Sequence, residues 1–172
     1  MLGLTNKLLE IINLFSDVSL NVQDPNPEAI SQDLLDRSGK AYLDGDADAF
    51  VACFAFPHRI ITFDAVRVVP DEQTLRDVFM RLRRHFQSQG LTDIVRPCIQ
   101  ATFINHDTIQ ATHESRYLAG TRLIQRPSVG LSTIRRYGEV WRVVDGQYAI
   151  QDAPDHIRAL MDPGKDRRAE DG

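Results

Sequence analysis

The sequence contains only two cysteines, Cys53 and Cys98, and they stand alone, outside any CxxC or Cys/His spacing. This pattern excludes a zinc site built on cysteine pairs and a small secreted domain held together by disulfides. We expect both thiols to serve as small buried hydrophobic groups in a reducing compartment.

Long hydrophobic runs are also missing. The uninterrupted apolar stretches are only a few residues long, whereas a membrane-spanning helix needs about 20 residues. The first 15 residues carry Lys7 and Glu10 within their apolar pattern and lack a small-residue cleavage site, which argues against a secretory signal. Lys7 is the only basic residue there, so binding to an anionic membrane is disfavoured. The sequence therefore predicts a cytoplasmic protein without a membrane partner.

An excess of basic charge is absent as well. The net charge is −4 and the pI is near 5.7, which disfavours a nucleic-acid partner because phosphate binding needs a concentrated basic patch. The one basic cluster comprises Arg81, Arg83, Arg84 and His85. It lies in a helical pattern, and we expect it to form a solvated helix face.

Cofactor motifs are missing too. The sequence has no HExxH or HxH for a metal, no GxGxxG or GxxxxGK[ST] for a nucleotide and no GxSxG for a serine hydrolase. No cofactor and no metal are implied.

The apolar residues that are present, 42% of a 172-residue chain, suffice for one domain with an ordinary core. Asn26 followed by Pro27 predicts the start of a helix that ends at Gly45. Asp46 caps a short second helix, ADAFVACF, that Pro57 terminates. Asp71 caps a third helix with a clear apolar stripe that ends at Gly90. The stripe consists of Leu75, Val78, Phe79, Leu82 and Phe86.

The rest of the pattern is β. Residues 60–63 and 66–69 form a small hairpin around the turn at Asp64 and Ala65. Four long strands follow, at about 93–105, 108–124, 130–144 and 147–152. The dipeptide Asp145-Gly146 is the strongest hairpin signal, because a two-residue primed turn needs φ above zero. We expect these consecutive strands to form an antiparallel meander.

The two ends of the chain differ from this central domain. Residues 1–24 form an amphipathic helix and a linker, with an apolar stripe that includes Leu4, Leu8 and Phe15, and Pro25 and Pro27 separate them from the next helix. The stripe needs a protein partner, either in its own domain or in a second copy. The chain after Pro163 lacks an apolar anchor, and residues 161–172 are expected to form a disordered tail. The domain itself spans residues 25–160.

This element order resembles the NTF2-like superfamily, and its sequence style over about residues 28–152 is similar to the SnoaL-like branch. The resemblance lies in AYLDGDADAFVACF, in the hairpin RIITFDAVRVV and in the terminal EVWRVVDGQYAI. It implies an α+β cone in which three helices pack against a strongly curved antiparallel or mixed sheet, with the N-terminal helix as an addition. Such cones enclose a mostly apolar pocket that serves small ligands, acid–base catalysis or only dimerisation.

Strand alternation indicates which residues face that pocket. In the strand from Thr108, His113 and Tyr117 share a face with Ile109 and Ala111, and this face should point into the cone. Burial would keep His113 neutral and able to accept or donate one proton. Alternatively, it is a core histidine bonded to a carbonyl or to Tyr117. His58, beside Pro57, would lie near the pocket mouth or on the surface.

Aromatic residues with polar tips complete the candidate pocket, although most such residues belong to a core. The further pocket candidates are Tyr42, Phe63, Trp141, Tyr148 and Asp152. Ketosteroid-isomerase-type members of the superfamily use carboxyl groups on the sheet interior together with a helix tyrosine. Here Asp152 is the only acid expected on an inner face, which argues against that mechanism.

Three functions remain open. The first is binding of a small, largely apolar molecule in the cone. The second is a cofactor-independent isomerase, cyclase or dehydratase that uses His113, with His58 or a tyrosine, for acid–base chemistry. The third is a non-catalytic interaction module. We also expect a homodimer through the sheet, because Leu131, Ile134 and Val140 add apolar surface beyond what one helical layer covers.

Overall fold

Helix α2 (Pro27–Asp44) begins and ends where the sequence predicts. The computed structural model describes residues 26–163, so the predicted N-terminal helix and most of the C-terminal tail lie outside the described residues. The Asn26 side chain caps the helix by accepting from the backbone of Glu28 at 2.9 Å. Gly45 ends it with φ of +79°, a conformation that glycine adopts without a Cβ clash.

The short helix α3 (Ala47–Val51) follows at once, with Asp46 as its cap. It ends earlier than predicted, because Phe54 already belongs to strand β1 (Phe54–Ile61) and Pro57 lies within that strand. Strand β2 (Val66–Val69) returns antiparallel to β1, as the hairpin pattern predicts.

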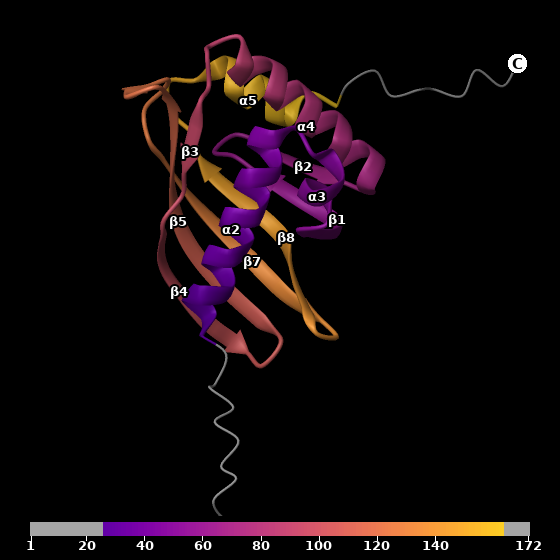
Figure 1. Ribbon diagram of the computed structural model, residues 1–172. Coiled ribbons are helices and arrows are strands. Elements are labelled where there is room, and N and C mark those ends of the chain that lie inside the picture. The colour runs from indigo at the N-terminus through magenta and orange to yellow at the C-terminus, as the bar shows by residue number, and fades with distance from the viewer. Residues whose placement is uncertain (1–25, 164–172) are drawn as a thin grey trace, which may run out of the picture.

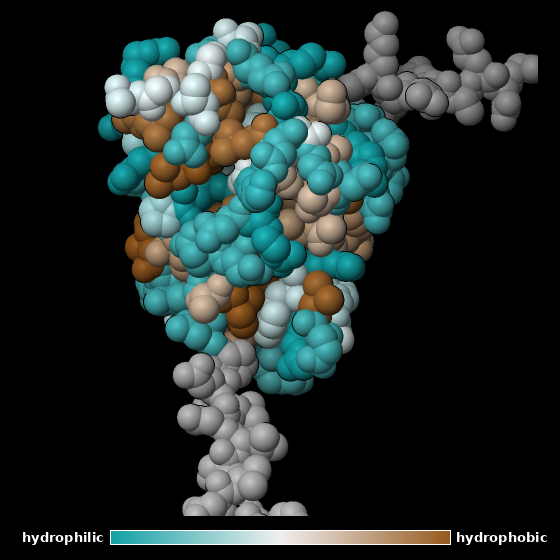
Figure 2. All heavy atoms as spheres, viewed as in Figure 1, coloured by the Kyte–Doolittle hydropathy of each residue, from teal (hydrophilic) through white to brown (hydrophobic). Residues whose placement is uncertain are grey.

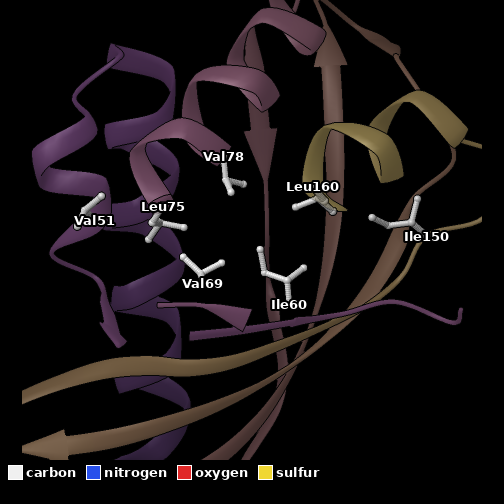
Figure 3. Packing of buried hydrophobic residues seen from close by; sticks show 7 residues of the cluster. All are labelled: Val51, Ile60, Val69, Leu75, Val78, Ile150 and Leu160. Atoms are coloured by element: carbon white, nitrogen blue, oxygen red, sulfur yellow. The ribbon is translucent and has the colours of Figure 1, made fainter. Parts of the chain in front are cut away.

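Helix α4 (Glu72–Gln87) confirms the clearest helical pattern in the chain. Asp71 caps it, and its apolar stripe is turned inward. Figure 3 shows Leu75 and Val78 pointing from α4 toward Ile60 and Val69 of the β1–β2 hairpin. This cluster fixes α4 across one end of the sheet.

The sheet is mixed and strongly curved (Figure 1). Its remaining strands are β3 (Asp93–Val95), β4 (Cys98–Asn105), β5 (Thr108–Ala119), β6 (Arg122–Leu123), β7 (Ser128–Tyr137) and β8 (Val140–Ala149). The order is β2-β1-β8-β7-β5-β3, and β4 and β6 also pair with β5. Only the β1–β8 pair is parallel among the described pairs. Breaks near Pro97 and at Gly120 divide two strands that the sequence predicts as continuous.

The predicted hairpin at Asp145-Gly146 is wrong. Both residues lie inside β8, where β7 pairs on one side and β1 on the other. Arg59 of β1 donates two hydrogen bonds to Asp145, at 2.6 and 2.8 Å. The chain turns instead at Gly138, which has φ of +62°. Pairing on both edges therefore outweighs the local preference of the dipeptide for a turn.

A fourth helix, α5 (Pro154–Met161), was not predicted from the sequence. It packs beside α4 at the wide end of the sheet (Figure 1). The basic cluster of α4 bonds to two neighbouring helices, since Arg81 donates to the carbonyl of Ala159 in α5 at 3.4 Å and Arg83 donates to that of Leu43 in α2 at 3.0 Å. The cluster is thus only partly a solvated face.

The helices cover the concave face of the sheet, and hydrophilic side chains cover much of the outward side of α2 (Figure 2). Ile134, expected on the exposed face, is only 1% exposed and lies in the core with Leu34 and Ile109. Cys53 belongs to the same cluster, and both cysteines are free. No helix in residues 26–163 is long and apolar enough to cross a membrane.

Candidate functional site

The floor of the site is the concave face of β5, β7 and β8. The predicted alternation in β5 is confirmed, since Ile109, Ala111 and His113 are buried. His113 pairs in register with Gly130, which pairs with Tyr148. The next row across the same strands contains Ser132 and Gly146. The rings of His113 and Tyr148 fill the positions above Gly130 and Gly146, and the small Ser132 beside them leaves space above the floor.

This space is a cavity of about 100 Å³ between the sheet, α2, α4 and α5. An engineered apolar cavity of roughly 150 Å³ can hold benzene, so this one suits a molecule of about that size or smaller. Apolar side chains from helices and strands make up most of its wall. These include Leu34, Leu35, Phe50, Phe54, Leu82, Phe86, Ile134, Val143 and Leu160.

His113 lies against the backbone of β7 inside the cavity. A Cβ on Gly130 would approach its Cε1 to 2.5 Å, so only glycine accommodates the ring in this position. Burial, with a smaller contribution from the charge of Arg96, lowers the pKa of His113 to about 4. Its Nδ1 atom is buried without a hydrogen-bond partner among the described residues. His113 is therefore neutral at pH 7 and has a free ring nitrogen.

Three predicted tyrosines line the same cavity: Tyr42 from α2, Tyr117 from β5 and Tyr148 from β8. Tyr117 stacks on Phe86 with ring centres 4.2 Å apart. Burial raises the pKa of Tyr148 to about 12 and also raises the pKa of Tyr42 and Tyr117. The Tyr42 hydroxyl is buried with no partner in the described part of the chain. All three phenols are neutral hydrogen-bond donors at physiological pH.

Arg96, which sequence reasoning missed, also lines the cavity. It lies between β3 and Pro97. Val95 pairs with Arg116 and Cys98 pairs with His113, and this register places Arg96 opposite Ser115. Strand alternation could have identified it, because Arg96 lies on the same inward face as Ile94 and Cys98. Burial lowers the pKa of Arg96, although an arginine stays charged throughout the physiological range.

His156 of α5 is a second histidine in the cavity wall that the sequence analysis did not single out. Its ring contacts Phe86 edge to face at 4.9 Å, and its Nδ1 lies 3.0 Å from Nε2 of Gln125. Burial, and then the neighbouring His85, lower the pKa of His156 to about 3. Because α5 was not predicted, nothing in the strand pattern could place this residue.

His58 does not line the cavity. It is buried in β1 with its ring edge on Phe54, at a centroid distance of 5.0 Å. Burial lowers the pKa of His58 to about 4, and backbone groups of Val144 oppose that shift. It therefore lies neither at a pocket mouth nor on the surface, because the strand begins before Pro57 and turns the ring inward.

Three further predicted pocket residues also lie elsewhere. Phe63 is 64% exposed in the turn between β1 and β2. Trp141 packs beside Phe103 and the first turn of α2, outside the cavity wall. Asp152 lies beyond β8, and its side chain is 83% exposed. The last strand ends before this residue, so the alternation from which its direction was predicted does not reach it.

No aspartate or glutamate lines the cavity. Within residues 26–163, no group of three or more histidines, cysteines or acidic residues could hold a metal ion. The arrangement offers neutral imidazoles, phenols, serine hydroxyls and one guanidinium around an apolar space.

No family model and no curated protein matches the chain. Solved structures do match its fold. An NTF2-like protein of unknown function from Shewanella oneidensis aligns with 73% of this chain and 100% of its own, at 10% identity and a TM-score of 0.58. An NTF2-like protein with a cystatin-like fold from Novosphingobium aromaticivorans aligns with 93% of this chain and 97% of its own, at 22% identity and a TM-score of 0.57.

This chain has the NTF2-like fold. A ketosteroid isomerase-like protein from Erwinia carotovora has a similar fold, with 72% of this chain and 95% of that chain covered, 10% identity and a TM-score of 0.54. The cone predicted from the sequence is confirmed, with α5 as an additional helix. The finer resemblance to the SnoaL-like branch stays a prediction. Because NTF2-like folds carry different activities, function must be argued from the cavity.

Proposed function

We propose that this protein binds a small, largely apolar molecule in the cavity that His113 and Ser132 line. The observation that carries the proposal is an apolar cavity lined by Tyr42 and His113, each with a buried polar atom, the hydroxyl and Nδ1, that lacks a partner among the described residues. Buried polar groups are nearly always hydrogen-bonded, so unpartnered ones beside a cavity support a site for a ligand or ordered water.

The volume of about 100 Å³ limits the ligand to about the size of one aromatic ring. A suitable probe is benzyl alcohol, which has an apolar ring and one hydroxyl. We expect it to raise the melting temperature of the full chain increasingly with its concentration, because a ligand that binds only the folded state stabilises it.

The variant Ser132→Leu would fill the floor of the cavity, since Ser132 is buried on its inner face. Its neighbour Thr133 does not line the cavity, so Thr133→Leu is a matched control. We expect Ser132→Leu to abolish the thermal shift and Thr133→Leu to retain it. Equal shifts in both variants, or no shift in the unmodified protein, would contradict the proposal.

Catalysis by His113 is the second candidate. The place of His113 in the cavity wall supports it, since a neutral imidazole can remove a proton from a bound carbonyl compound. However, a base whose pKa is about 4 is weak at neutral pH, and no carboxylate assists it. Binding therefore ranks first. The test is hydrogen–deuterium exchange at the methyl group of acetophenone. Faster exchange with the unmodified protein than with His113→Ala would favour catalysis.

We also propose that the protein forms a homodimer through the convex face of its sheet. Ile99 and Val129 are exposed there, next in sequence to the inward-facing Cys98 and Gly130. A specific dimer interface buries about 1,600 Å² in total. Sedimentation of a monomer at micromolar concentration would contradict this proposal.

A further inference from the structure

Arg96 is the one cationic side chain in the wall of the cavity. Of the other polar residues in the wall, the two histidines and three tyrosines are neutral at pH 7, as described above, and the remainder are serines. Within residues 26–163, no carboxylate lies within ion-pair distance of the Arg96 guanidinium. Several other arginines, including Arg37, Arg59 and Arg158, do have such a partner.

The protein holds this side chain through a single nitrogen. Nη2 of Arg96 donates to the Ser38 hydroxyl at 2.9 Å and also to the carbonyl of Leu35. Gly39 makes this approach possible, because a Cβ there would lie 2.8 Å from Nη2. The Gln32 side chain fixes the adjoining backbone by bonding the Arg96 carbonyl at 3.2 Å and the Cys98 amide at 2.8 Å.

The other two guanidinium nitrogens, Nε and Nη1, have no hydrogen-bond partner among the described residues. An arginine carries five donors in a rigid fork that matches a carboxylate. The guanidinium is partly buried, and Asp36, beyond ion-pair distance, is a nearby carboxylate whose charge acts on it. Such a cation favours an anion, because little opposite charge offsets its loss of hydration. The site is therefore positively charged and incompletely satisfied.

The cavity side suits an anion better than the other side of Arg96. A groove outside, between α2 and β3, also reaches Arg96, but Asp36 and Asp44 line it. Those carboxylates repel an incoming anion, and the cavity contains none. A single cation matches a monoanion, whereas a phosphate dianion would need further positive charge.

We propose that the natural ligand is a small carboxylate whose apolar body fills the cavity and whose anionic group binds Arg96. This inference rests on the proposed function, since it requires that the cavity be a binding site. The carboxylate would accept from the free guanidinium nitrogens, and Tyr117 and Tyr148, which lie close enough to act on Arg96, would offer neutral donors to its second oxygen.

The test compares benzoate with benzamide, a neutral molecule of nearly the same shape, by calorimetric titration of the full chain. Benzoate should bind at least about tenfold more tightly, because charge-assisted hydrogen bonds are the stronger kind. If benzamide binds as well as benzoate, this inference is overturned and the proposed function stands. If neither probe binds, both are overturned.

Variants locate the anion. Arg96→Gln should abolish the preference, so that benzoate and benzamide bind about equally. Arg96→Lys should keep part of the preference, since lysine retains the positive charge but not the forked donors of the guanidinium. Arg37→Gln, which removes an exposed arginine of α2, should leave the preference unchanged. If Arg96→Gln does not fold, the benzoate–benzamide comparison in the unmodified protein still decides. Benzoate binding that survives Ser132→Leu would place the anion in the outer groove and overturn the inference.

Discussion

Replacing Gly130 by alanine should move His113, because the added methyl group would occupy the space of the ring. The new Cβ would lie 2.5 Å from Cε1 and 2.6 Å from Nε2 of His113, well inside the contact distance of about 3.5–4.0 Å between carbon atoms. The ring is buried, so it cannot swing freely into water. Overpacking of this kind costs about 1–3 kcal/mol.

The substitution of Gly130 by alanine also has a stabilising effect, which is smaller than the cost of overpacking. The φ of Gly130 is not in the left-handed region, so alanine fits the backbone and stiffens the unfolded chain. Glycine within a strand is less stable than alanine by about 0.5–1 kcal/mol. Gly130→Ala should therefore lower the free energy of unfolding by up to about 2 kcal/mol.

A double-mutant cycle isolates the contact. In a His113→Ala background the clash is absent, so Gly130→Ala should be neutral or stabilising by up to about 1 kcal/mol. Equilibrium urea unfolding of the four proteins, followed by circular dichroism, measures the coupling, which we expect to be about 1–3 kcal/mol. Additive effects of the two substitutions would refute the packing of His113 on Gly130.

Three further predictions concern the core, a helix cap and pH. Phe79→Ala should lower the free energy of unfolding by about 3–5 kcal/mol, because Phe79 is fully buried; an unchanged urea midpoint would show that the site can collapse around the loss. Asn26→Ala should cost about 1 kcal/mol through the lost cap of α2, and Asn26→Asp, which keeps the cap, should show no such loss in thermal unfolding. Burial lowers the pKa of His58 and His113 to about 4 and that of His156 to about 3. Histidines in the unfolded chain have a pKa near 6.5, so as the pH falls the unfolded chain takes up protons that the folded chain does not. Stability should be level above pH 7 and fall by up to about 1.4 kcal/mol per pH unit for each histidine between pH 6.5 and 4; urea midpoints that are the same at pH 7.5 and pH 5 would contradict these buried neutral histidines.

Helix starts were predictable because they depend on nearby residues. Asn26 with Pro27, Asp46 and Asp71 each cap the helix that the sequence assigns to them. The inward face of β5 was predictable too, since alternation with a buried face is a local pattern. These features place Tyr42, His113 and Tyr117 in the cavity.

Features that depend on distant strands were not predictable. Asp145-Gly146 favours a turn locally, but pairing with β1 and β7 keeps it extended. Asp152 and Phe63 were assigned inward directions from strands that end before them. Arg96 falls in a stretch that the sequence predicts as one continuous strand, whereas in the structure that strand is interrupted at Arg96 and Pro97.

Helix α5 was missed because it is short and follows the last strand closely. Its sequence does carry signals, since Pro154 occupies the first turn and Ile157, Leu160 and Met161 fall on one side. The helix is part of the site, because its residues His156 and Leu160 form the part of the cavity wall that lies above the sheet.

The most direct test of ligand binding in the cavity is an NMR titration of the full chain with benzyl alcohol, followed through the histidine and tyrosine ring signals. Binding in the cavity predicts saturable shifts at His113, Tyr117 and Tyr148, which line it. His106, whose side chain is 87% exposed, should not shift and is the internal control. Shifts at His106 alone, or no saturable shift at the three cavity residues, would contradict the proposal that this cone is a binding site.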